Sequence, residues 1–165
     1  MSTFNGLPAH ALLVHFIVVL APLTAILAIL CAVWPAARER LVWLVLALAI
    51  VTGILTPLTT EAGEWLAHRT ARSPLLHTHT GLGDTMIYFS GALFIAALLL
   101  AVLHLRAGRG KPLSTVLSAV VAAFVLVAGL ATIVQTYRIG DSGAKATWSD
   151  KALTRVPSGD GDDEG

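Results

Sequence analysis

A run of 25 residues without a charged side chain, Ala9–Val33, constrains this chain more than any other feature. It contains no Asp, Glu, Lys or Arg. A helix of this length rises about 37 Å, at about 1.5 Å per residue, and can cross a hydrocarbon layer of about 30 Å. Pro8 precedes the run and suits the first turn of a helix, where its missing N–H would have no partner anyway. The run therefore predicts a transmembrane helix over about residues 8–34.

Three further apolar segments follow, and we expect helices at about residues 41–60, 74–104 and 113–137. The chain is 56% hydrophobic and only 13% charged, which excludes an ordinary soluble domain or soluble enzyme. We predict an all-α membrane protein. Its residues 1–140 form an antiparallel four-helix transmembrane bundle, and residues 141–165 form a polar, partly disordered tail.

The basic residues of the short loops predict the orientation of the bundle. The loops after the first and third helices hold five of them: Arg38, Arg40, Arg106, Arg109 and Lys111. Cytoplasmic loops carry such an excess of Lys and Arg, so we expect a multi-pass protein of the cytoplasmic membrane with both termini outside the cytoplasm. The net charge of +1 argues against nucleic acid as a partner and leaves the lipid bilayer as the main one.

The histidines are the strongest functional signal. Five of the six fall at the end of the bundle that is predicted to lie outside: His10, His15, His68, His77 and His79. An ionisable side chain within a membrane is costly, so it needs a partner or a function. Such histidines could also simply be wetted at the membrane surface or hydrogen-bond a neighbouring helix.

Helix geometry narrows the pairing of these histidines. His10 and His15 point about 140° apart on the first helix, so they do not suit one metal ion together. His77 and His79 point to opposite sides of the third helix, and His79 shares its face with Gly83 and Met86. One histidine from each helix is therefore the natural pair. We expect His15 to be buried about two turns into the membrane, at nearly the depth of His79.

Three stretches resemble a family of bacterial membrane proteins called domain of unknown function 2231. They are Leu7–Phe16, which holds two histidines, Ala62–Leu66, and His79–Asp84. The resemblance covers about residues 6–148 and marks His79, rather than His77, as the family position. Members also occur fused to Rieske or cytochrome c domains, which implies electron transfer near a membrane. Relatives tend to have histidine where this chain has Asp141.

We therefore predict an electron carrier or binding protein rather than an enzyme. Imidazoles can supply the axial ligands of haem, and we expect haem b bound by His15 and His79, with His10 and Glu64 as neighbours. A redox partner or a membrane complex would then contact it, and the bundle could form a homo-oligomer. One alternative is a non-catalytic helper subunit with structural histidines. Another is a zinc or copper site formed by His10, His15, His79 and Glu64.

Overall fold

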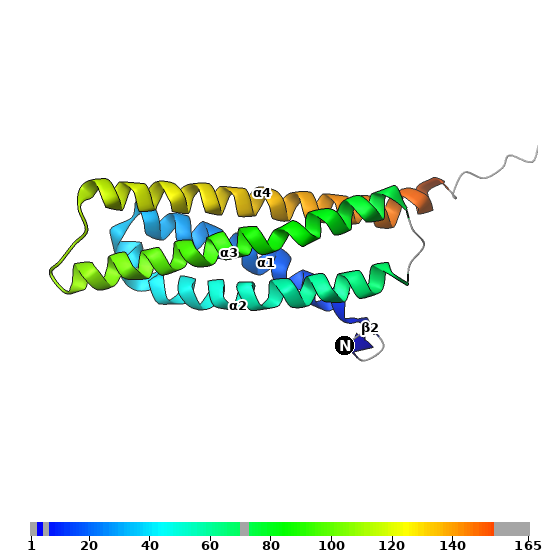
Figure 1. Cartoon of the computed structure of the whole chain (residues 1–165), viewed down its shortest axis with the longest axis horizontal. Helices are drawn as coiled ribbons and strands as arrows, with labels where there is room; N and C mark the ends of the chain where they lie inside the picture. The colour runs from blue at the N-terminus through cyan, green and yellow to red at the C-terminus, as the bar shows by residue number, and fades with distance from the viewer. Residues whose placement is uncertain (1–2, 5–6, 70–72, 154–165) are drawn as a thin grey trace, which may run out of the picture.

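Four long helices make up most of the part of the chain that the structure describes (Figure 1). The computed structural model describes residues 3–4, 7–69 and 73–153, and places side chains over residues 10–69 and 73–148. The helices are α1 (Ala9–Val33), α2 (Pro35–Ala67), α3 (Pro74–Gly108) and α4 (Thr115–Leu153). Before them, the short strands β1 (Thr3–Phe4) and β2 (Leu7–Pro8) pair antiparallel.

The helices run alternately up and down, as an antiparallel four-helix membrane bundle. Each helix packs against the next one in the chain, and α4 also packs along α1, so that α1 and α3 lie diagonally across the bundle axis. The starts of α1 and α3 and the ends of α2 and α4 meet at one end (Figure 1). We call this end, which holds His10 and His79, the histidine end.

The bundle core consists of small and aliphatic side chains. Ala21, Ala25, Ala28 and Cys31 follow one stripe of α1 and are fully buried, which lets neighbouring helices approach closely. Threonines complete the interior, and their hydroxyls donate to the carbonyl four residues earlier in the same helix, as Thr52 does to Leu48. Their polar groups are therefore satisfied within the helix, as a membrane interior requires.

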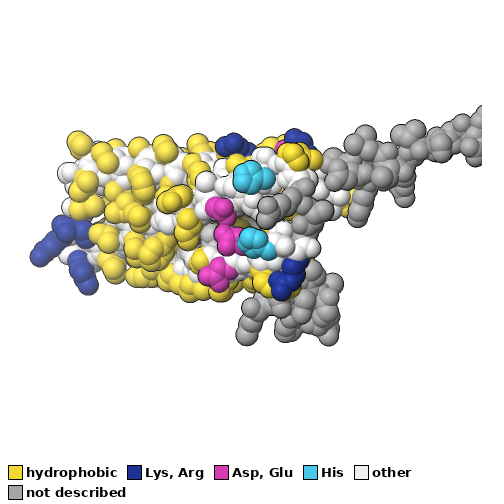
Figure 2. Space-filling model, turned by 45° about the vertical axis from the view of Figure 1, so that its right-hand side comes forward, with side chains coloured by type: hydrophobic (Ala, Val, Ile, Leu, Met, Phe, Trp, Pro, Cys, Tyr) yellow, Lys and Arg dark blue, Asp and Glu magenta, His cyan; other side chains and the backbone are white. Residues whose placement is uncertain are grey.

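Each helix is long and apolar enough to cross a membrane. Large apolar side chains remain exposed on all four, among them Phe16, Ile54, Ile95 and Val127. Figure 2 shows these hydrophobic side chains along the bundle, with basic side chains at the end opposite the histidines. Acidic and histidine side chains gather toward the histidine end, where further basic side chains also lie.

Of the four helices, α1 lies within its predicted limits, whereas the start predicted at residue 41 and the ends predicted at residues 60, 104 and 137 are wrong. α2 begins at Pro35 and ends at Ala67, α3 continues to Gly108, and α4 continues to Leu153. Hydropathy detects the part of a helix that lies in lipid, whereas a helix can continue into water wherever polar residues allow it. The part of the predicted disordered tail after residue 153 lies outside the described residues.

Candidate histidine site

A cavity lies at the histidine end between the four helices. It measures about 640 Å³, and its lining includes His10, His15, Glu64, His79 and Asp84. Toward the bundle centre it meets a narrower chamber of about 60 Å³, which is also lined by His10 and His79. The other walls of this chamber are mostly apolar.

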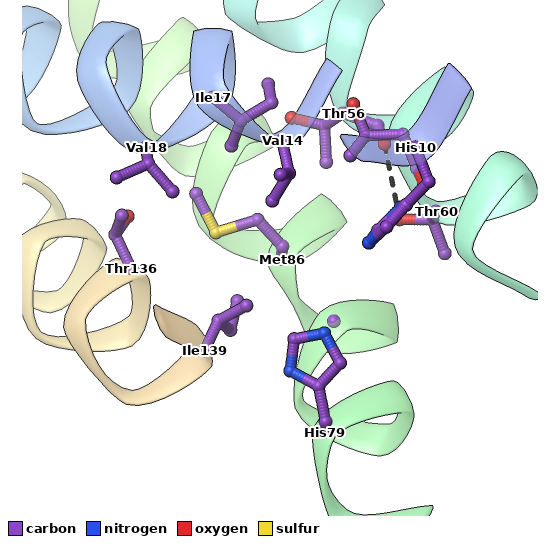
Figure 3. A pocket seen from close by; sticks show the side chains of 12 residues that line it. His10, Val14, Ile17, Val18, Thr56, Thr60, His79, Met86, Thr136 and Ile139 are labelled. Carbon is purple, nitrogen blue, oxygen red and sulfur yellow. Dashed lines mark hydrogen bonds between the residues drawn. The ribbon is translucent and has the colours of Figure 1, made fainter. Parts of the chain in front are cut away.

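The chamber walls come from all four helices (Figure 3). Val14, Ile17 and Val18 belong to α1, Thr56 to α2, Met86 to α3, and Thr136 and Ile139 to α4. The two imidazoles approach this space from α1 and α3, the diagonal helices.

His10 is oriented by a bond to the neighbouring helix. Its side chain is half-buried in the first turn of α1, and its Nδ1 lies 3.0 Å from the carbonyl oxygen of Thr59 on α2. A carbonyl oxygen can only accept, so Nδ1 carries the hydrogen and donates it. Nε2 is then left with its lone pair, which is the form that binds a metal ion.

His79 is oriented in a similar way from α4. Its Nδ1 lies 3.0 Å from the Ser142 hydroxyl oxygen, and that hydroxyl lies 2.9 Å from the carbonyl oxygen of Ile139. Since the Ser142 hydrogen is donated to Ile139, its oxygen accepts from Nδ1 of His79. Nε2 of His79 again keeps its lone pair, and Figure 3 shows a nitrogen of each ring directed into the space between the two rings.

Each imidazole also lies against a glycine of the following helix. A Cβ added at Gly63 would come within 2.9 Å of the His10 ring, and one added at Gly143 within 3.0 Å of the His79 ring. Separations this short force something to shift. The absence of a side chain at Gly63 and Gly143 therefore leaves room for the two rings, and we call these two positions the glycine seats. The His10 ring of α1 packs on Gly63 of α2, and the His79 ring of α3 packs on Gly143 of α4 in the same way.

The predicted ligand residues are arranged differently from what the sequence suggested. His79 lies where expected, on one face with Gly83 and Met86. His10, not His15, shares the chamber with it. The expectation that His15 is buried is wrong, because its side chain is exposed and its Nδ1 bonds the Ala11 carbonyl oxygen of its own helix. Glu64 is exposed and, like His15, lines only the wider cavity.

The remaining candidates lie outside the cavity. His68 and His77 are exposed, and His104 packs edge-on against Trp43 near the other end of the bundle, with ring centroids 6.1 Å apart. Asp141 forms an exposed ion pair with Lys145 at 2.7 Å. Within the part of the chain that the structure describes, no three His, Cys, Asp or Glu side chains could together hold a metal ion.

Sequence reasoning missed Ser142 and Gly143. Both lie in the stretch predicted to be the polar tail, and the sequence does not indicate whether that tail contacts the bundle. The spacing of Gly140 and Gly143 could have indicated this contact, because two glycines three residues apart lie on one face of a helix. Both glycines line the cavity.

A comparison with protein-family models agrees with this picture. The family described as predicted membrane protein (DUF2231) matches residues 6–155. The chain belongs to this family. The match includes both histidines of the chamber and both glycine seats, so the whole site lies within the DUF2231 region. Neither the curated proteins nor the solved structures gave a match.

Proposed function

We propose that this DUF2231 protein binds haem b between His10 and His79 and carries electrons at the cytoplasmic membrane. One observation carries the proposal: two imidazoles on diagonal helices each engage Nδ1 with an oxygen and leave Nε2 free at one apolar chamber. Haem sites in helix bundles are built in this way, from side chains on facing helices.

The residues present fit such a cofactor. The chamber of about 60 Å³ is too small for haem by itself, but His10 and His79 also line the wider cavity. Its volume of about 640 Å³ lies within the range of roughly 300–1,000 Å³ that is usual for cofactor pockets. Haem, when bound, supplies one-electron chemistry. His10 and His79 would hold it through Nε2, while the Thr59 carbonyl and the Ser142 hydroxyl keep the rings oriented. The apolar walls of the chamber would exclude water.

We further propose that the histidine end faces the outside of the cytoplasm. Five basic residues support this orientation: Arg38 and Arg40 in the first turns of α2, Arg106 in the last turn of α3, and Arg109 and Lys111 between α3 and α4. Lys and Arg are enriched next to the cytoplasmic ends of transmembrane helices. A redox partner would then meet the protein on the outer side of the membrane.

A second function, that of a helper subunit with structural histidines, has its own support. The two Nδ1 bonds join α1 to α2 and α3 to α4, and such bonds stabilise helix packing without any cofactor. A zinc or copper site is a third proposal with less support. Zinc usually takes four ligands, whereas only two imidazoles share the chamber.

The absorption spectrum of the purified protein, produced with ample haem, separates these proposals. We expect about one haem b per chain with the spectrum of a six-coordinate iron. Stoichiometric zinc or copper without haem would favour the metal site. The absence of both would refute the cofactor and leave the helper subunit.

A further inference from the structure

Three of the helices are longer than a membrane requires. α2, α3 and α4 have 33, 35 and 39 residues, which corresponds to about 50–58 Å at about 1.5 Å per residue. The hydrocarbon layer is only about 30 Å thick. Each of these helices must therefore be tilted in the membrane, or about 20 Å or more of its length must lie outside the hydrocarbon.

The charged residues indicate where the hydrocarbon ends. Between Arg40 and Glu61 on α2, and between Asp84 and Arg106 on α3, about 20 consecutive residues carry no Asp, Glu, Lys or Arg. Each stretch rises about 30 Å, the thickness of the hydrocarbon. The two stretches are in register, because Trp43 packs against His104 at the end opposite the histidines. The hydrocarbon therefore ends near Glu61 and Asp84.

Exposed aromatic residues agree with this boundary. Tyr88 is 77% exposed and Tyr137 is 73% exposed. Tyr88 lies about one helical turn from Asp84 toward the bundle centre, and Tyr137 directly precedes Arg138, the first charged residue of α4. Tyrosines are enriched at the membrane–water interface, where the ring is apolar and the hydroxyl is wet.

The histidine pair lies beyond this boundary. His79 is five residues outward from Asp84, or about 7.5 Å along α3. Gly63, on which the His10 ring lies, comes after Glu61, and Ser142 comes four residues after Arg138. His79, Ser142 and the glycine beneath the His10 ring thus lie on the parts of the helices outside the hydrocarbon, residues 61–67, 74–84 and 138–153, and the Thr59 carbonyl that accepts from His10 lies at the boundary. We call these parts the helical collar.

We propose that the cavity is entered from water, through a mouth in the helical collar that admits small cationic solutes more readily than anionic ones. The lining includes the exposed residues Glu64, Asp84 and Thr147 together with Thr80. Among the described residues of this lining, none is Lys or Arg. Clefts lined by one sign of charge concentrate solutes of the opposite sign. This proposal goes beyond the bound cofactor, because it holds whichever group the histidines bind.

Cysteine labelling in membrane vesicles tests the water access. In a Cys31→Ala background, Thr80→Cys would react with a membrane-impermeant maleimide, whereas Ile95→Cys, exposed on α3 within the uncharged stretch, would not. Thr147→Cys, at an exposed position of the same cavity lining, serves if Thr80→Cys fails to insert. Vesicles of both orientations are labelled without added haem, so the result depends neither on sidedness nor on the cofactor.

The proposal is overturned if both collar cysteines are as unreactive toward the maleimide as Ile95→Cys in both kinds of vesicle. That result would indicate a site reached from the bilayer. The charge selection has its own test. A cationic methanethiosulfonate is expected to modify Thr80→Cys roughly tenfold faster than an anionic one. Glu64→Gln with Asp84→Asn should remove this preference. Equal rates for the two reagents before those substitutions would refute the acidic mouth.

Discussion

The two histidines of the chamber are oriented by oxygens of different kinds. The partner of His10 is a backbone carbonyl, that of Thr59, and no side-chain substitution removes it. The partner of His79 is the Ser142 hydroxyl, which a substitution can remove. This difference allows the orienting bond to be tested on one histidine while the other stays unchanged.

Replacing Ser142→Ala should weaken haem binding by about 10–100-fold, the usual cost of losing the partner of a ligating histidine. The physical reason is that Nδ1 of His79 loses the hydroxyl oxygen that accepts from it, which leaves the ring less firmly oriented. Titration of the apoprotein with haem measures the effect. Ser142→Thr keeps a hydroxyl and should bind haem more tightly than Ser142→Ala, and equal affinity of both variants with the natural protein would contradict the assignment.

The glycine seats give a second prediction. Gly63→Ala should lower the free energy of unfolding by about 1–3 kcal/mol, because the new methyl group overlaps the His10 ring. The matched control is Gly53→Ala on the same helix, where a Cβ meets no atom within 4 Å. That change should be neutral or should stabilise the helix by up to about 1 kcal/mol. Denaturant unfolding in detergent compares the two, and equal stability of both variants would refute the seat.

The choice between His10 and His15 illustrates what the sequence could not decide. The spacing correctly indicates that the two rings point apart, so only one can face the bundle axis. Which one does so depends on how α1 is rotated against α2 and α4. That rotation follows from packing, such as the contact of His10 with Gly63, and not from the depth of a residue along its own helix.

The helices themselves were predictable in number and order, but less so in length. The start predicted for the third helix at about residue 74 agrees with the start of α3 at Pro74, where the Ser73 hydroxyl accepts from the N–H of Leu76. The start of α2 was missed by six residues because Arg38, Glu39 and Arg40 resemble a loop. They instead form its first turns after Pro35.

Close packing between α1 and α4 is tested by Gly129→Leu. A Cβ at Gly129 would come within 2.9 Å of Ile29 and 3.4 Å of the Ala25 carbonyl oxygen, so a larger side chain should destabilise the bundle by about 1–3 kcal/mol. Gly91→Leu on α3 is the control, since a Cβ there meets nothing within 4 Å. The thermal midpoint of each variant is measured in detergent, and equal midpoints would contradict the packing.

At the scale of the whole molecule, α1 with α2 and α3 with α4 hold their histidines in the same way. Each pair brings a histidine from the start of its first helix onto a glycine near the end of its second helix. The sequence contains these residues but no repeat that would reveal the correspondence. The correspondence between the two histidines can be recognised only when the diagonal arrangement of α1 and α3 is known. That arrangement directs a nitrogen of each ring into the space between the two rings (Figure 3).

The orientation in the membrane gives a further prediction. In intact cells and a Cys31→Ala background, a cysteine at Gly108 should be shielded from an impermeant thiol reagent. A cysteine at Ala144, on the exposed surface of α4, should be labelled. The reason is that Arg106, Arg109 and Lys111 surround Gly108 in the sequence, and such basic residues are enriched at the cytoplasmic ends of transmembrane helices. The reverse labelling pattern would place the histidine end in the cytoplasm.

The central claim is that His10 and His79 together hold one cofactor, and the spectra of three matched variants test it most directly. The haem-loaded protein is compared with His10→Ala, His79→Ala and His15→Ala by absorption and electron paramagnetic resonance. We predict that the first two variants lose the six-coordinate signature and that His15→Ala keeps it, because only His10 and His79 share the chamber. A six-coordinate spectrum that survives in His10→Ala but is lost in His15→Ala would contradict the claim.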